Sequence, residues 1–300
     1  MWLRIVVIVV ALGLCAAKAE TGLAQRQDIL DSSLVVRFLD AAYGEAVWIT
    51  TPNIDPERRA TILINCGPPG FGGRLALQLQ TAKVTRIDSL ILSGAGDELI
   101  GGCADLLQQI PIREIRWTGQ RGETAAWDAL DALFTAQKWE LVRMAQPDVL
   151  YWGDNVQAVV LNPPLFNDWR PDPDKSLALE IDYARWGILY GGDIHGRGED
   201  QVKPWLGWSQ AAIQVLKVAD HGSRTGSSSD FLKAVFATGV PLMSKYAVVT
   251  NGNVPGSIDV DRRVVDDLQS VGAEVVTTAE HGTITIVVHP DFGPRYVSER

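Results

Sequence analysis

The chain has 300 residues, a formal net charge of −9 and 46% hydrophobic residues. This length can bury one large core or two smaller ones, and the composition is that of a globular protein, not of a disordered chain. The acidic charge repels phosphate backbones, so we expect no generic nucleic-acid coating, although the charge is compatible with a local basic groove. The composition leaves the physiological partner unknown.

The first 19 residues have the layout of a secretory signal peptide. Arg4 supplies a positive start, residues 5–17 are apolar, and Ala17-Lys18-Ala19 forms a small-x-small cleavage site. The apolar run is about 13 residues long, whereas a helix that spans a bilayer needs roughly 20. We therefore expect cleavage and export to the periplasm or the extracellular space, with membrane attachment only if residues 1–19 stay uncleaved. Residues 20–33 are polar and form a lead-in segment before a single domain, 34–300.

Apolar alternation, broken by Gly/Pro turns, predicts a strand-rich first half. Its expected strands are two within 34–52, then 62–66, 87–92 and 114–117, and its expected helices are 74–83, 100–110 and 123–137. The helix at 74–83 depends on Leu75 and Leu79, which lie four residues apart on one face.

The second half is predicted to alternate strands and helices around one long loop. The expected strands are 140–144, 149–152, 156–161, 176–183, 187–190, 213–218, 246–250, 274–277 and 283–288, with helices from Ser228 or Ser229 onward and at 260–271. The long loop is the Pro/Asp-rich segment 162–175, of a length that is usually functional or mobile. With no linker between the halves, this order indicates one α/β (α+β) domain of two facing sheets with helices outside.

One stretch, LSGAGDELIGG at 92–102, has the position of an active-site loop. An apolar strand ends in a small-residue loop that carries Asp97 and Glu98, and a helix is expected to follow. Loops that follow buried strands hold functional groups on a rigid support in many α/β proteins. The stretch has the shape of a metal-binding loop, yet it contains no histidine.

Two cysteines remain after signal cleavage. Cys66 ends a predicted strand, and Cys103 begins the helix after the central loop. An exported protein can oxidise them, so a disulfide is one interpretation, and two small buried apolar side chains are the other.

Four segments together resemble the metallo-β-lactamase fold, and within it the soluble hydrolase-like domain of the ComEC competence proteins. They are FLDAAYGEA at 38–46, ILINCG at 62–67, LYGGDI at 189–194 and VLKVADHGSRTGSSSDFLKAV at 215–235. The resemblance covers about residues 34–288. It implies a four-layer αββα sandwich with a binuclear metal site, usually zinc, at one edge, where the metal activates water for phosphodiester hydrolysis.

The ligand positions that the resemblance implies are largely changed in this chain. Its metal-loop histidines fall on Gly94 and Leu99, another ligand position on Gly96, and its Asp on Glu98. Three further positions have lost the family residue, namely Asn65, Asp220 and Val254. With four histidines in the whole chain, a five-histidine site cannot form.

The candidates that remain are Asp97, Glu98, Asp193, Asp220 and His221. Asp193 matches the metal-bridging carboxylate of the family, and Glu98, Asp193 and His221 could hold one ion (Zn²⁺, Mn²⁺, Mg²⁺ or Ca²⁺). Equally, Asp193 could hydrogen-bond the following turn, His221 could be a satisfied packing residue, and Glu98 could cap its helix. His195 is expected to be a solvated loop residue.

We therefore expect a protein with a degenerate site and no cofactor, a pseudoenzyme that binds or scaffolds in the cell envelope. The alternative is a metal-dependent phosphodiesterase or nuclease-like hydrolase that uses a reduced, carboxylate-rich site.

Overall fold

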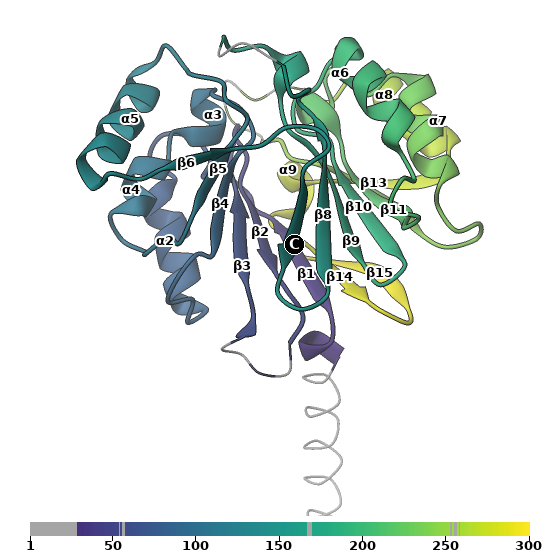
Figure 1. The fold of residues 1–300 in the computed structure, drawn as a ribbon. Helices are drawn as coiled ribbons and strands as arrows, with labels where there is room; N and C mark the ends of the chain where they lie inside the picture. Colours follow the sequence, from purple (N-terminus) through teal and green to yellow (C-terminus); the bar gives the residue numbers. More distant parts are fainter. Residues whose placement is uncertain are drawn as a thin grey trace, which may run out of the picture.

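Two β-sheets face each other in the computed structural model, and helices cover their outer faces (Figure 1). The structure describes residues 29–300 except 54, 56, 57, 167–169, 253, 255, 256 and 258. The predicted signal segment, 1–19, and most of the lead-in lie outside the described residues. Within the part that is described, no helix is long and apolar enough to cross a membrane.

The first sheet has eight strands and combines the two ends of the domain. Its order is β15-β14-β1-β2-β3-β4-β5-β6. The strands are β1 (Leu34–Phe38), β2 (Val47–Thr50), β3 (Thr61–Ile64), β4 (Ser89–Leu92), β5 (Ile115–Trp117), β6 (Leu141–Arg143), β14 (Ile284–His289) and β15 (Gly293–Ser298). β1 pairs antiparallel with β2 on one side and with β14 on the other, so that Leu34 lies opposite Val288.

The second sheet has seven strands in the order β13-β12-β11-β10-β9-β8-β7. The strands are β7 (Val149–Trp152), β8 (Val156–Asn162), β9 (Ala178–Tyr183), β10 (Trp186–Tyr190), β11 (Ala212–Lys217), β12 (Lys245–Val249) and β13 (Ala273–Thr277). β10 to β13 run parallel, as do β3 to β6 in the first sheet. Parallel neighbours end at one edge of their sheet, so the loops that follow them gather there.

Helices pack on the outer face of each sheet. On the first sheet they are α2 (Gly72–Thr81), α3 (Asp97–Ile100), α4 (Cys103–Leu107) and α5 (Ala125–Gln137), and on the second α6 (Gly196–Val202), α7 (Ser229–Ala237) and α8 (Arg262–Ser270), as Figure 1 shows. The short α9 (Thr278–His281) joins β13 to β14.

Three buried apolar clusters hold these four layers together. One lies between the sheets and includes Val36, Phe38 and Ile188, and the other two lie under the helices of each side. Alternation on the strands explains this division, because successive side chains point to opposite faces of a sheet. The four-layer αββα sandwich expected from the sequence is the observed fold.

The helix expected at 100–110 is two short helices, α3 and α4, with Gly101 and Gly102 between them. A Cβ atom on Gly102 would lie 2.4 Å from the backbone oxygen of Cys66 and 2.7 Å from the amide nitrogen of Gly72. The chain therefore crosses close to the loop after β3, and a continuous helix with larger side chains would not fit.

Three elements were not predicted: the short helix α9, the helix α6 and the strand β15. α6 begins with a Gly-Arg-Gly sequence of low helix propensity, and its stability comes from tertiary contacts: Asp174 accepts the amide of Gly198 at 2.8 Å. β15 begins Gly-Pro and is an edge strand, a place where proline is tolerated because no ladder donor is needed.

Candidate functional site

The loops after β3, β4, β10, β11 and β12 meet at the edge where the parallel strands end. Gly191 and Gly192 turn the chain after β10 and place Asp193 there. β11 ends in Lys217, and a short 3-10 helix, η4 (Ala219–Gly222), carries Asp220 and His221. These residues come from two of the segments that carry the family resemblance, 189–194 and 215–235.

A buried ion pair occupies the middle of this edge. The ammonium of Lys217 contacts the carboxylate of Glu45, and both side chains have 0% of their surface exposed. Lys217 Nζ also donates to the backbone oxygen of Gly192 at 2.9 Å and lies 3.6 Å from Asp193 Oδ1. Burial alone would lower the pKa of Lys217, but the negative charges of Glu45 and Asp193 outweigh it and raise that pKa. Lys217 is therefore a permanent buried cation.

Glu45 is held by hydrogen bonds from several elements. Its carboxylate accepts from the Tyr190 hydroxyl, from Asn65 Nδ2 at 3.0 Å and from Thr250 Oγ1 at 3.0 Å. Burial would raise the pKa of Glu45, and the neighbouring Lys217 and His221 lower it below the usual value. Burial and the charge of Glu45 raise the pKa of Tyr190 well above the usual value. The tyrosine is thus a lasting donor, and Glu45 a lasting acceptor.

Asn65 connects this network to the central loop. Its Nδ2 donates to Ser93 Oγ at 2.8 Å, and its Oδ1 accepts the Ser93 amide at 3.0 Å. Asn65 has a positive φ of 62°, a left-handed conformation that asparagine tolerates better than most residues. Asn65 Nδ2 also lies 3.2 Å from the hydroxyl of Tyr190 on β10, so this side chain links the first sheet to the second at their shared edge.

Asp193 and His221 face each other without a completed hydrogen bond. Nδ1 of His221 bonds the backbone oxygen of Thr250, which can only accept, so the proton sits on Nδ1 and Nε2 is an acceptor when the ring is neutral. Nε2 lies 3.8 Å from Asp193 Oδ1, and neither atom has a hydrogen-bond partner within the described part of the chain, although Lys217 Nζ lies 3.6 Å from Asp193 Oδ1. Burial raises the pKa of Asp193, although Lys217 and His221 act against it. Two buried acceptors in this arrangement call for a proton, or a small donor, between them.

Asp97 and Glu98 contact residues of the central loop and of the start of α5. Asp97 accepts a hydrogen bond from Thr124 Oγ1 at 2.5 Å and so ties α3 to the start of α5. The Glu98 carboxylate folds back over Gly96, where a Cβ atom would lie 1.9 Å from Glu98 Oε1, and it accepts its own backbone amide. Burial raises the pKa of Glu98; the charge of Asp193 adds to this rise, and the hydrogen bond to its own amide and the nearby His221 oppose it. Glu98 thus lies near the pair while capping its own helix.

Asp220 points to a different group of side chains. It accepts from Ser223 Oγ, from Thr225 Oγ1 at 2.7 Å, and lies 3.0 Å from His195 Nε2. His195 is therefore paired, not simply solvated. Asp220 and His221 both have positive φ, 47° and 52°, and consecutive left-handed non-glycine residues store backbone strain of the kind found at functional sites.

The two cysteines predicted as a possible pair form a disulfide. Cys66 follows β3 and Cys103 opens α4, and their Cα atoms are 5.1 Å apart. The bond joins the loop after β3 to the segment that follows the central loop. It thereby fixes the backbone on both sides of Asp97 and Glu98.

The donor set does not fit a binuclear metal site. Gly94, Gly96 and Leu99 offer no ligand atoms, and Asp97 and Asp220 are engaged away from the pair of Asp193 and His221. Among the residues that the structure describes, no group of three or more His, Cys, Asp and Glu side chains is arranged to hold a metal ion. The Lys217 ammonium 3.6 Å from Asp193 would also repel a second cation.

Glu45 and Lys217, the centre of the network, were missed as candidates in the sequence. A signal was present: Lys217 interrupts the apolar run of β11, and a lysine there must either leave the sheet or find a buried anion. The identity of that anion was not readable, because Glu45 lies 172 positions earlier in the chain.

Comparisons with known proteins agree with the architecture. No protein-family model and no curated protein matches the chain by sequence. Among solved structures, a variant of the CmlA β-hydroxylase superposes with a TM-score of 0.51 at 13% identity, over 84% of this chain and 53% of that one. The chain thus spans about half the length of that protein.

Two further similar structures align with this chain over almost their whole length. The metallo-β-lactamase fold protein YhfI from Bacillus subtilis has a TM-score of 0.47 at 11% identity, over 83% of this chain and 98% of that one. Zn²⁺-bound PqqB from Methylobacterium extorquens has a TM-score of 0.46 at 11% identity, over 81% and 97%. The strand order, the four layers and the CmlA superposition show that the chain has the metallo-β-lactamase fold.

Proposed function

We propose that this chain is an exported metallo-β-lactamase-fold protein of the ComEC-like type that has given up metal-dependent hydrolysis and acts as a binding or scaffolding protein of the cell envelope. The observation that carries the proposal is the changed ligand set: Gly94, Gly96 and Leu99 supply no side-chain donor, and Asp97 and Asp220 are hydrogen-bonded away from Asp193 and His221. The Lys217–Glu45 pair lies at the same edge. A buried ammonium lies against Asp193, the carboxylate that the family resemblance assigns to bridging two metals. The positive charge that such a carboxylate needs is supplied by the protein itself.

The disulfide supports the export part of the proposal. Disulfides persist in oxidising compartments and are rare in the cytosol. The Cys66–Cys103 bond would therefore be kept after transport to the periplasm or beyond. Mass spectrometry of the protein purified from its envelope fraction tests this directly: the expected N-terminus is Glu20, and a chain that retains Met1 in the cytosol would contradict export.

Metal content and turnover test the loss of hydrolysis. The mature protein is purified without chelators, its metal content is measured by elemental analysis, and its activity on bis(p-nitrophenyl) phosphate is followed with Zn²⁺, Mn²⁺, Mg²⁺ or Ca²⁺ added. We expect metal well below one equivalent and turnover no higher than that of Asp193→Ala. Asp128→Ala, which changes an exposed carboxylate on α5, is the matched control. Metal-dependent turnover that Asp193→Ala removes and the control keeps would refute the proposal.

A second candidate function is a hydrolase with a reduced, carboxylate-rich site. The observation in its favour is the pair of unpartnered buried atoms, Asp193 Oδ1 and His221 Nε2, with Glu98 nearby. Calorimetric titration with Zn²⁺ or Mn²⁺ separates the two functions. One tightly bound equivalent that is lost in His221→Ala would favour the hydrolase, and no heat of binding together with an unchanged melting temperature would reject it.

A further inference from the structure

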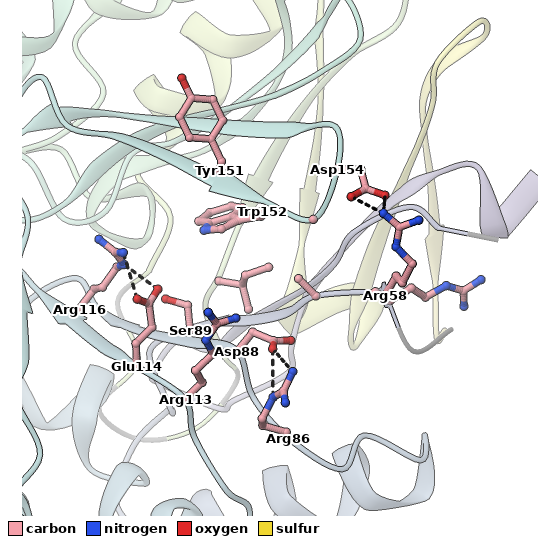
Figure 2. Close-up of a pocket in the computed structure, with 14 residues that line it drawn as sticks. Arg58, Arg86, Asp88, Ser89, Arg113, Glu114, Arg116, Tyr151, Trp152 and Asp154 are labelled. Atoms are coloured by element: carbon pink, nitrogen blue, oxygen red, sulfur yellow. Dashed lines mark hydrogen bonds and ion pairs between the residues drawn. The ribbon is translucent and has the colours of Figure 1, made fainter. Parts of the chain in front are cut away.

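A cavity lies at the opposite end of the sandwich from the candidate site. It has a volume of about 470 Å³ and is formed by the beginnings of β3 and β4, the segment before β5 and the end of β7 (Figure 2). Ser89, which opens β4, lines it, whereas Ser93, just past the other end of the same strand, belongs to the Asn65 network. Its volume is within the range of about 300–1,000 Å³ typical of small-molecule sites.

Arginine dominates the lining of this cavity. The charged residues that line it are Arg58, Arg59, Arg86, Arg113, Arg116, Asp88, Glu114 and Asp154. Five cations and three anions line the cavity, and Arg59 also pairs with Asp31 outside the lining, so one arginine is in excess in a chain whose net charge is −9. Concentrating arginine in one hollow of an acidic protein raises the local positive potential and favours anions over cations or neutral ligands.

Most of these arginines are held by neighbouring carboxylates. Arg86 makes two hydrogen bonds to Asp88 Oδ1, at 3.1 and 2.7 Å, and Arg116 makes two to the Glu114 carboxylate, at 2.7 and 3.0 Å. Arg58 bonds Asp154. These pairs fix the walls of the cavity and neutralise much of their charge.

Arg113 is different. Its guanidinium forms no hydrogen bond or ion pair within the described part of the chain, although it lines the cavity beside three paired arginines. Figure 2 shows it rising from the segment before β5 toward Trp152, with Ser89 next to it. A guanidinium without a carboxylate in such a place is available to an anion from solution.

Two buried donors in the same lining also lack partners. Ser89 is 2% exposed and Trp152 is 5% exposed. Neither Ser89 Oγ nor Trp152 Nε1 has a hydrogen-bond partner in the described structure. Nearly all buried polar groups in folded proteins are paired, so unpaired donors at a cavity wall indicate a ligand that accepts from them. This observation is independent of the charge count.

We propose that this cavity binds the phosphate group of a small phosphate monoester, with Arg113, Ser89 Oγ and Trp152 Nε1 as its donors. The three donors come from three different segments, and a phosphate monoester has three terminal oxygens to accept from them. A carboxylate presents its acceptor oxygens in one plane and carries one negative charge, whereas the phosphate group presents three oxygens tetrahedrally, carries more charge and so can meet donors from three directions. The remaining volume, between the Arg58 and Arg86 pairs, takes the organic part of the ligand. The proposal does not depend on what the opposite edge of the sandwich binds.

Calorimetric titration of the mature protein at low salt tests the proposal, with phenyl phosphate, inorganic phosphate and benzoate as probes. We expect both phosphates to bind and benzoate to bind roughly tenfold more weakly, because its planar, singly charged carboxylate matches donors from three directions less well than a phosphate does. Arg113→Ala should weaken phenyl phosphate by roughly tenfold or more, about the effect of one lost charge-assisted hydrogen bond. Arg262→Ala removes an exposed arginine from α8, on the other side of the molecule, and should leave the affinity unchanged.

Ser89→Ala separates a ligand-binding role from a structural one. The hydroxyl makes no hydrogen bond to any residue that the structure describes, so its loss should leave the urea midpoint unchanged or slightly higher while the affinity for phenyl phosphate falls. A variant that loses stability and keeps its affinity would overturn the assignment of Ser89. Absence of phosphate binding to the unaltered protein, equal affinity for benzoate, or equal effects of Arg113→Ala and Arg262→Ala would overturn the proposal.

Discussion

Replacing Asp182 by asparagine should stabilise the protein, and more at pH 8 than at pH 5. Asp182 lies on β9, faces the helix layer and is 8% exposed, and neither of its carboxylate oxygens has a hydrogen-bond partner in the described structure. Burial, together with the charge of Glu180 two residues away on the same face, raises the pKa of Asp182 to about 7. The unfolded chain has no such environment, so there the pKa is near 3.8.

The sign of the effect follows from proton linkage. A carboxyl whose pKa is higher in the folded state favours folding at low pH, and this contribution is lost as the pH rises from the unfolded to the folded pKa. Each pK unit corresponds to about 1.36 kcal/mol. The raised pKa of Asp182 therefore lowers the free energy of unfolding by about 4 kcal/mol at pH 8 and by about 1–2 kcal/mol at pH 5, a difference of about 3 kcal/mol. The amide of Asp182→Asn has nearly the same shape and does not ionise.

Urea unfolding followed by tryptophan fluorescence at both pH values measures this difference. The free energy gained from Asp182→Asn should be larger at pH 8 by about 3 kcal/mol, and comparing the same substitution at two pH values cancels the packing change that it introduces. Asp128→Asn on the exposed face of α5 is the control and should show no such difference. An equal effect of Asp182→Asn at pH 5 and pH 8 would show that the carboxyl is ionised in both and that its burial is relieved in solution.

Three further predictions concern the candidate site. Reducing the Cys66–Cys103 bond, whose cysteines are 37 residues apart, should lower the free energy of unfolding by about 4 kcal/mol, seen as a lower urea midpoint with a phosphine reductant present. Lys217→Met leaves Glu45 buried without its cation and should cost about 3–5 kcal/mol, part of which Glu45→Gln in the same chain restores; additive losses in that double-mutant cycle would argue against the pair. Gly102→Ala places a methyl group 2.4 Å from the Cys66 backbone oxygen and should destabilise the protein by about 1–3 kcal/mol, seen as a lower melting temperature. An unchanged melting temperature would mean that the loop can shift.

Local patterns were enough to predict most of the fold. The alternation of Leu34, Val36 and Phe38 predicted β1, and these side chains do lie in the core between the sheets. Strand and helix patterns of this kind act within a few residues, so a single sequence shows them. α6 could not be found in this way, because the groups that hold it, including Asp174, are distant in the sequence.

The candidate site was predictable in position and not in chemistry. The sequence motifs placed Asp193 and His221 at one edge, and the structure brings them to 3.8 Å of each other. What surrounds them depends on side chains from distant segments, above all Glu45 from the loop between β1 and β2, which no local pattern connects to Lys217. Asp220 was predicted as a possible ligand from its position in the sequence alone. In the structure its turn directs the carboxylate toward His195 instead.

The place of β1 between β2 and β14 has a consequence for how the molecule is made. The backbone N–H and C=O groups of β1 that face β14 stay unpaired until β14 has been synthesised, because Leu34 lies opposite Val288. A chain synthesised from its N-terminus therefore carries an open strand edge until β14 has emerged. Contacts over such a separation also form slowly. The last strands complete the first sheet, and a chain cut short before β14 would expose a long apolar edge to aggregation.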